Sequence, residues 1–120
     1  MKKILIVDDE ENLAKAIRRV LMKGGYNVEI TTDPLEAYKL IKKNELENEF
    51  DLVISDTMMP GMSGLELKAR LDEEGINVPF IGMSAIPDNK TEWEGLGSSF
   101  LNKPYKIKEL YDVVKEALKE

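Results

Sequence analysis

The sequence predicts an α/β fold in which a doubly wound sheet of five parallel strands carries helices on both faces. Five short apolar runs recur along the chain, segments with helical spacing of apolar side chains separate them, and the connections are short. The runs also lack alternation between apolar and polar residues, as is typical of strands buried on both faces of a parallel sheet. A chain of 120 residues has room for one such domain, which we expect to span residues 1–120.

The first strand and helix are expected within residues 4–23. Residues 4–7 form an apolar, β-branched run that ends at two acids, and residues 12–23 show helical spacing. Gly24 and Gly25 supply a stop, since glycine accepts the left-handed backbone that often follows a helix. The apolar face expected for this helix consists of Leu13, Ile17, Val20 and Leu21.

A second strand and helix are expected at residues 26–31 and 34–43. Asp33 followed by Pro34 is typical of a helix start, because Asp caps the first turn and Pro needs no N–H donor there. The acidic segment 44–49 is expected to be a loop. The apolar face expected for this helix consists of Leu35, Ala37 or Tyr38, Leu40 and Ile41.

The third strand is expected at residues 52–55, and it stops at Asp56 before a turn rich in Pro and Gly. A helix follows and ends near Gly75, with Gly64 at its start, where a small residue lets the backbone pass close to the strand. The apolar residues of this helix are Leu65, Leu67, Ala69 and Leu71. A fourth strand is expected at residues 78–83.

The last third of the chain combines a weak helix pattern with a strong one. Residues 88–96 are expected to be helical, although only Trp93 and Leu96 give this helix an apolar face. A fifth strand is expected at residues 99–102, before a clearly amphipathic final helix. The apolar residues of that helix are Ile107, Leu110, Tyr111, Val114 and Leu118.

The composition excludes several kinds of chemistry. The chain has no Cys and no His, so thiolate catalysis, Ser-His-Asp catalysis and imidazole metal ligation are ruled out. A metal site would have oxygen ligands, which suit Mg²⁺, Ca²⁺ or Mn²⁺. A net charge of −6 argues against direct binding of nucleic acid.

No apolar run approaches the roughly 20 residues of a membrane span. The four apolar residues that follow Met1, Lys2 and Lys3 are too few for a secretory signal. We therefore expect a cytoplasmic protein without membrane contact.

Reactive side chains end several of the predicted strands. The carboxyl ends of parallel strands share one edge of the sheet, where function usually gathers, so these residues are expected to meet. They are Asp8, Asp9, Asp56, Ser84 and Lys103. Three carboxylates in one cleft repel one another, and a divalent cation such as Mg²⁺ would offset that repulsion.

Asp56 is the candidate nucleophile, because a carboxylate can attack phosphorus and form an acyl phosphate. Lys103 would supply a cation and Ser84 a hydroxyl donor for the phosphoryl oxygens. Simpler readings stay open: Asp9 caps the first helix, Asp8 is solvated, Lys103 is a surface lysine, Asp56 merely starts a turn, and Ser84 is a small residue that ends a strand. The Lys103–Pro104 bond is a candidate for the cis form, which only X-Pro bonds adopt cheaply.

Taken together, residues 4–10, 51–66, 83–85 and 103–105 resemble the receiver domain of two-component response regulators, and the resemblance covers the whole chain. It implies a flavodoxin-like fold with strand order 2-1-3-4-5. It also implies roles for individual residues: Asp56 as the phosphoacceptor, Asp8 and Asp9 as Mg²⁺ ligands together with Asp56 and the backbone carbonyl of Met58, Lys103 as the phosphate-binding lysine, Ser84 as the switch hydroxyl, and Phe100 as the aromatic switch.

The resemblance implies a stand-alone response regulator without an output domain. The phosphoryl donor would be a phosphohistidine on a sensor histidine kinase or a His phosphotransfer protein, since this chain has no His. The chain would catalyse its own phosphorylation as a signalling protein rather than a turnover enzyme. It would signal by phosphorylation-dependent docking to another protein.

Two departures from the family pattern carry expectations of their own. The segment between Ser84 and Lys103 is shorter than is usual, so residues 88–96 are expected to form at most two helical turns and to be mobile. Gly97-Ser98-Ser99 also replaces the usual Gly-Ala. Met58 and Ile86 are apolar and offer no group to orient an attacking water, which predicts a long-lived phosphoryl group.

Two rival functions belong to other classes. A Mg²⁺-dependent phosphate-ester hydrolase of the haloacid dehalogenase type needs a second Asp two residues after the first, where this chain has Met58. A scaffold that keeps only the fold would not need the acidic pair, Asp56 and Lys103.

Overall fold

The structure is a computed structural model, and it describes residues 1–43 and 49–120. Within those residues, five strands and five helices alternate, and the strands form one parallel sheet of order β2-β1-β3-β4-β5. The strands are β1 (Lys3–Val7), β2 (Asn27–Thr31), β3 (Leu52–Asp56), β4 (Phe80–Ser84) and β5 (Ser99–Asn102). The helices are α1 (Glu11–Lys23), α2 (Pro34–Lys43), α3 (Gly64–Glu73), α4 (Asn89–Gly95) and α5 (Ile107–Leu118). The predicted fold class and strand order are confirmed.

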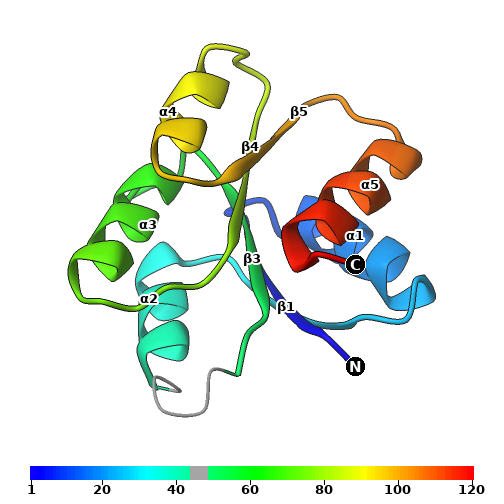
Figure 1. Cartoon of the computed structure of the whole chain (residues 1–120), viewed down its shortest axis with the longest axis horizontal. Helices are drawn as coiled ribbons and strands as arrows, with labels where there is room; N and C mark the ends of the chain where they lie inside the picture. The colour runs from blue at the N-terminus through cyan, green and yellow to red at the C-terminus, as the bar shows by residue number, and fades with distance from the viewer. Residues whose placement is uncertain (44–48) are drawn as a thin grey trace.

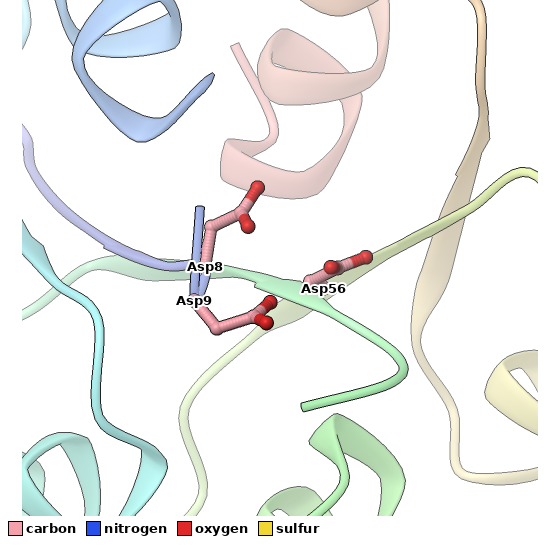
Figure 2. A group of neighbouring side chains, drawn as sticks. All are labelled: Asp8, Asp9 and Asp56. Atoms are coloured by element: carbon pink, nitrogen blue, oxygen red, sulfur yellow. The ribbon is translucent and has the colours of Figure 1, made fainter. Parts of the chain in front are cut away.

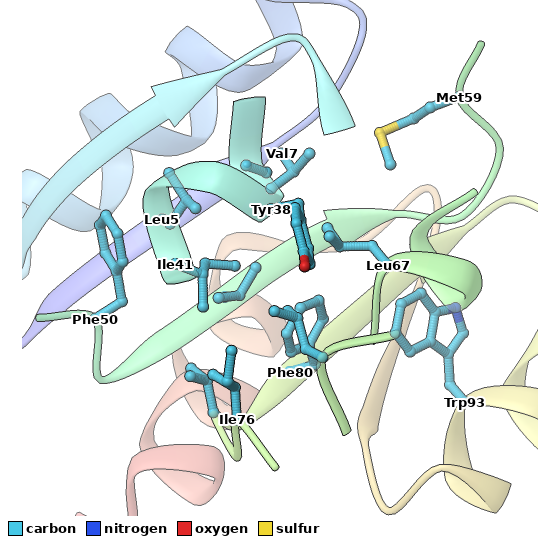
Figure 3. Close-up of a cluster of buried hydrophobic side chains, with 14 residues drawn as sticks. Leu5, Val7, Tyr38, Ile41, Phe50, Met59, Leu67, Ile76, Phe80 and Trp93 are labelled. Carbon is cyan, nitrogen blue, oxygen red and sulfur yellow. The ribbon is translucent and has the colours of Figure 1, made fainter. Parts of the chain in front are cut away.

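The sheet separates two hydrophobic cores. Helices α1 and α5 lie on one side of the sheet, and α2, α3 and α4 lie on the other (Figure 1). Adjacent strand residues point to opposite faces, so Ile4 and Ile6 pack in the α1/α5 core while Leu5 and Val7 pack in the other. Figure 3 shows this second core, which includes the large ring of Trp93.

Three leucine or isoleucine side chains that were expected in helix faces are exposed instead. Leu13, Leu35 and Ile107 have relative exposures of 42%, 44% and 59%. All three lie in the first turn of a helix or close to it, and in α1 the inward position belongs to Ala14 beside Ile17. The helical period was therefore predicted correctly, but these three expected core positions were wrong.

Element boundaries follow the local chemistry closely. The N–H of Leu35 donates to Asp33 Oδ1, as expected for a capped helix start. Strand β4 begins at Phe80 rather than at residue 78, because Pro79 has no N–H to donate to a ladder. The loop expected at 44–49 lies, apart from residue 49, outside the described residues. None of the helices in the described part of the chain is long and apolar enough to cross a membrane.

Helix α4 is short, as predicted: its seven residues make about two turns. The mobility expected of residues 88–96 stays a prediction. The helix is fastened to the sheet by Trp93, which is fully buried and stacks on Phe80 with 6.2 Å between ring centroids.

A glycine brings the start of α3 against the end of β3. A Cβ on Gly64 would lie 2.2 Å from the backbone oxygen of Asp56, so no larger residue fits without a backbone shift. The N–H of Gly64 also donates to the carbonyl of Thr57 at 2.8 Å. The loop that follows Asp56 is therefore held close to the sheet edge, which fixes the position of this carboxylate.

Candidate functional site

The carboxyl ends of β1 and β3 bring three carboxylates together. Asp8 and Asp9 follow β1 and Asp56 is the last residue of β3, and these strands are direct neighbours in the sheet. One carboxylate oxygen from each lies within 4.8 Å of the others, and Figure 2 shows the three side chains as neighbours at these strand ends. The cluster predicted from the strand ends is thus present in the structure.

Asp8 is the buried member of the cluster. Its side chain has no exposed surface, and its Oδ1 accepts the N–H of Glu10 at 2.9 Å. Its Oδ2 is buried and accepts no hydrogen bond from the described residues. Burial raises the pKa of Asp8, and the negative charges of Asp56 and Asp9 act in the same direction, against the Glu10 N–H and Lys103.

Lys103 is the cation that faces the cluster. Its Nζ lies 3.3 Å from Oδ1 of Asp56 and 3.8 Å from Oδ2 of Asp8, the second distance being too long for a hydrogen bond. Its backbone N–H donates to the carbonyl of Ser84 at 2.8 Å, which fastens the end of β5 to the end of β4. The Lys103–Pro104 bond is cis, in agreement with the expectation for this X-Pro pair.

Asp56 remains open to a reactant. Its side chain is 15% exposed, in contrast to Asp8, while Oδ1 accepts the N–H of Thr57 at 3.1 Å and the Nζ of Lys103. A carboxylate that is fixed through one oxygen and open to solvent beside a cation is placed to act as a nucleophile.

The two predicted switch residues, Ser84 and Phe100, lie on β4 and β5. The hydroxyl of Ser84 donates to Oδ1 of Asn89 at 2.7 Å, and no hydrogen bond joins it to Asp56 among the described residues. Phe100 is half-buried on β5 and packs against the core on the α2/α3/α4 side. Ser84 is therefore at the predicted strand end, but its proton is directed at α4 rather than at the carboxylate cluster.

The donor set fits a hard divalent cation. Three carboxylates within ligand distance of one another, and a buried Asp8 oxygen without a hydrogen bond, form the kind of oxygen site that Mg²⁺ takes. With no His or Cys in the chain, softer metals have no imidazole or thiolate ligand here.

Comparison with known families agrees with this geometry. The sequence model of the response regulator receiver domain matches residues 4–115. The chain belongs to this family. As a receiver domain it is a component of two-component signalling, and its five-stranded sheet with an acidic cluster is consistent with a phosphoacceptor role.

Relatives of this receiver domain are found in several bacteria. The response regulator RppA of Synechocystis is 35% identical over 111 residues, which cover 90% of this chain and 47% of RppA. An uncharacterised transcriptional regulatory protein of Bacillus subtilis, YkoG, is 34% identical over 120 residues, which cover 98% of this chain and 51% of that protein. The chain therefore spans about half the length of the curated relatives it matches.

Solved receiver structures have the same fold. The receiver domain of the Francisella response regulator 1452 superimposes with a TM-score of 0.88 at 33% identity, covering 99% of this chain and 98% of the other. The chemotaxis protein CheY4 of Vibrio cholerae gives a TM-score of 0.81 at 30% identity, with 98% of each chain covered.

A hollow beside the cluster continues the site toward α1. It has a volume of about 460 Å³, and its lining combines the charged groups of Asp8 and Lys103 with apolar surface. The lining residues are Asp8, Leu13, Ala16, Ile17, Ala85, Lys103, Pro104 and Tyr105. Leu13, one of the exposed apolar residues, thus lies on the wall of a recess next to the acids of the receiver domain.

The sequence analysis assigned no role at the site to Thr57, Trp93 or Asn89, which connect the receiver site to α4. Thr57 donates its hydroxyl to the carbonyl of Met83 and accepts the indole N–H of Trp93 at 2.9 Å. Asn89 accepts the Ser84 hydroxyl. One signal was available: Gly82 inside a strand indicates close approach by another group, and Trp93 was the large side chain on the helix opposite.

Proposed function

We propose that the chain is a phosphorylation-dependent switch in which Asp56 accepts a phosphoryl group from a phosphohistidine on a sensor histidine kinase or a His phosphotransfer protein. The observation that carries this proposal is the setting of Asp56: a partly exposed carboxylate, clustered with Asp8 and Asp9 and 3.3 Å from the ammonium of Lys103. Acids at this spacing suit a metal-assisted attack on phosphorus.

The transfer needs no proton from the receiver. An Asp56 oxygen attacks phosphorus, the P–N bond to the donor imidazole breaks, and its electron pair stays on the imidazole nitrogen. The Lys103 ammonium would move from the free carboxylate toward the phosphoryl oxygens, which carry more charge.

The residues that would hold Mg²⁺ are Asp8, Asp9 and Asp56, with the backbone carbonyl of Met58 as a further oxygen ligand. When bound, Mg²⁺ would supply positive charge to the phosphoryl oxygens during transfer. The buried Oδ2 of Asp8, which has no hydrogen bond in the described structure, supports this assignment. Its ionised form needs a cation nearby to offset burial.

The later steps of the signal follow from the same residues. Ser84 would donate its hydroxyl to a phosphoryl oxygen, and Phe100 would change its packing in response. Loss of the phosphoryl group is slow, because Met58 and Ile86 bring no polar group to activate water. The output is docking of the phosphorylated receiver to a partner protein, without direct contact to nucleic acid or membrane, and we place it in the cytoplasm.

Intact mass measurement tests the proposal. The wild-type chain is incubated with Mg²⁺ and acetyl phosphate, beside Asp56→Ala and the control Asp88→Ala, which removes an exposed acid that caps nothing through its side chain. We expect one added phosphoryl mass on the wild type and the control, and none on Asp56→Ala. An equal gain on Asp56→Ala, or no gain on any chain, contradicts the proposal.

A further inference from the structure

The hydroxyl of Ser84 already has a partner. Its Oγ donates to Asn89 Oδ1 at 2.7 Å and accepts the N–H of Ile86 at 2.9 Å, and the side chain is 5% exposed. A serine hydroxyl carries a single proton. While that proton is on the bond to Asn89, Ser84 has nothing to donate to a phosphoryl group on Asp56.

The amide of Asn89 is held in the orientation that this bond needs. Its Nδ2 donates to Oε1 of Glu92 at 2.8 Å, which leaves Oδ1 to face Ser84. Asn89 is half-buried at the first position of α4. The hydrogen bonds that join Ser84, Asn89 and Glu92 therefore run from the end of β4 along the first turn of the helix.

The first turn of α4 lacks the usual cap. Asp88 precedes it with a helical backbone and makes no capping hydrogen bond through its side chain. The Ser84–Asn89 bond therefore ties the start of the helix to the sheet. Trp93, one turn further on, is fastened separately through Thr57, so loss of the first tie need not detach the rest of the helix.

We propose that Asn89 is a positioning residue that holds the Ser84 hydroxyl in its resting orientation, so that a phosphoryl group on Asp56 takes this proton away from Asn89 and frees the first turn of α4. The inference rests on the proposed function of Asp56. A bond from a hydroxyl to a charged phosphoryl oxygen is stronger than one to a neutral amide, which gives the exchange its direction. In this step the Ser84 hydroxyl only changes its hydrogen-bond acceptor. Its O–H bond stays intact, and no other covalent bond forms or breaks.

Coupling of this kind acts in both directions. If phosphorylation frees the first turn of α4, then loosening that turn by removing the Asn89 acceptor must favour the orientation of Ser84 that serves the phosphoryl group. The segment 89–92 is therefore the part of α4 that reports the state of Asp56.

Amide hydrogen exchange of residues 89–95 tests the inference, with phosphorylation followed by intact mass. In the wild type, Mg²⁺ and acetyl phosphate are expected to speed exchange in the first turn about five-fold. Asn89→Ala without phosphodonor should already show this faster exchange, and phosphorylation should add less than about two-fold. The matched control is Thr91→Ala, which truncates an exposed polar residue on the same helix and should behave as the wild type.

A double-mutant comparison separates positioning from a general structural role. In a Ser84→Ala background, Asn89→Ala should change first-turn exchange much less than in the wild type, because the bond to Ser84 is already gone and only the exposed bond to Glu92 is left to remove. An equal effect in both backgrounds, or wild-type exchange in unphosphorylated Asn89→Ala, overturns the role of Asn89.

Failure of the proposed function gives a different result. If the wild-type chain gains no phosphoryl mass, both the proposed phosphoacceptor function and the phosphate-dependent part of this inference are contradicted. The unphosphorylated comparison still decides whether Asn89 ties down α4. Unchanged exchange in a chain whose mass shows full phosphorylation contradicts the inference alone.

Discussion

The indole of Trp93 lies so close to Gly82 that a Cβ on this glycine would come within 2.1 Å of two ring carbons. The same indole donates its N–H to the hydroxyl of Thr57, the residue after Asp56. Helix α4 is thereby packed, through its fully buried Trp93, against β4, the neighbour of the strand that ends at Asp56. Figure 3 shows Trp93 among the other buried side chains of this core. The attachment of α4 depends on the absence of a side chain at Gly82.

Gly82→Ala should destabilise the fold, because the added methyl group collides with a rigid, buried ring rather than with the end of a flexible side chain. We expect a loss of about 1–3 kcal/mol in the free energy of unfolding, measured by urea titration. The control is Gly95→Ala at the end of α4, where a Cβ meets nothing within 4 Å. It should be neutral or gain up to about 1 kcal/mol. Equal effects of the two changes would show that the indole does not fill this space in solution.

Asp8→Asn should raise the free energy of unfolding at neutral pH when a chelator removes divalent metal. Burial raises the pKa of Asp8, so the folded chain favours the protonated carboxyl. The stability that the protonated carboxyl contributes is fully present below the ordinary pKa of 3.8, and it is lost as the pH rises through the raised pKa of the folded chain. The advantage of Asp8→Asn over the wild type should therefore shrink as the pH falls toward 3.8.

Added Mg²⁺ should reverse that order. Saturation at 100 times the dissociation constant stabilises a chain that binds Mg²⁺ by about 2.7 kcal/mol. The wild type should gain stability of this size and Asp8→Asn much less, as measured by urea unfolding with and without the metal. A variant that is less stable than the wild type in chelator contradicts the account of the buried carboxylate.

Lys103→Ala should slow phosphorylation by acetyl phosphate about 100-fold, the loss typical of removing one charged donor from a transition-state site. The reason is geometric, since Lys103 is the cation within 4 Å of both Asp56 and Asp8. Lys108→Ala removes an equal charge from an exposed pair with Asp112 and should leave the rate unchanged. The rate of mass gain measures both, and similar slowing in the two variants would point to net charge instead.

Met58→Asn and Ile86→Glu should shorten the life of the phosphoryl group by at least about ten-fold, because each places a polar group where water is oriented for attack. Both side chains are open to solvent, at 68% and 51% exposure. Met22→Asn alters an exposed methionine in the second half of α1 and serves as the control. Decay of phosphorylated chain is followed by intact mass after removal of the donor, and an unchanged lifetime in the first two variants would rule out this explanation.

Much of the fold was predictable because its signals are local. Runs such as residues 4–7 and 52–55 are apolar on both faces, and Asp33-Pro34 fixes a helix start through its own chemistry. The wrong predictions concern positions whose burial depends on contacts with other elements. Leu13 and Leu35 have the right period for a core face, but they are 42% and 44% exposed near the start of their helices.

The site was predictable in its members and not in its details. The order of parallel strands is enough to bring Asp8, Asp9 and Asp56 to one edge. The direction of the Ser84 hydroxyl depends on Asn89, a side chain from another element. The sequence pattern does not indicate which rotamer a side chain adopts. The contact of Trp93 with Gly82 likewise becomes evident only when α4 is placed on the sheet.

Chemical mapping of the phosphoryl group tests the central claim most directly. After incubation with Mg²⁺ and acetyl phosphate, borohydride reduces an aspartyl phosphate to homoserine, and peptide mass spectrometry locates that residue. We expect homoserine at position 56 alone, at a yield that matches the fraction phosphorylated by intact mass. Homoserine at another acid, or a phosphorylated chain with none at position 56, contradicts it.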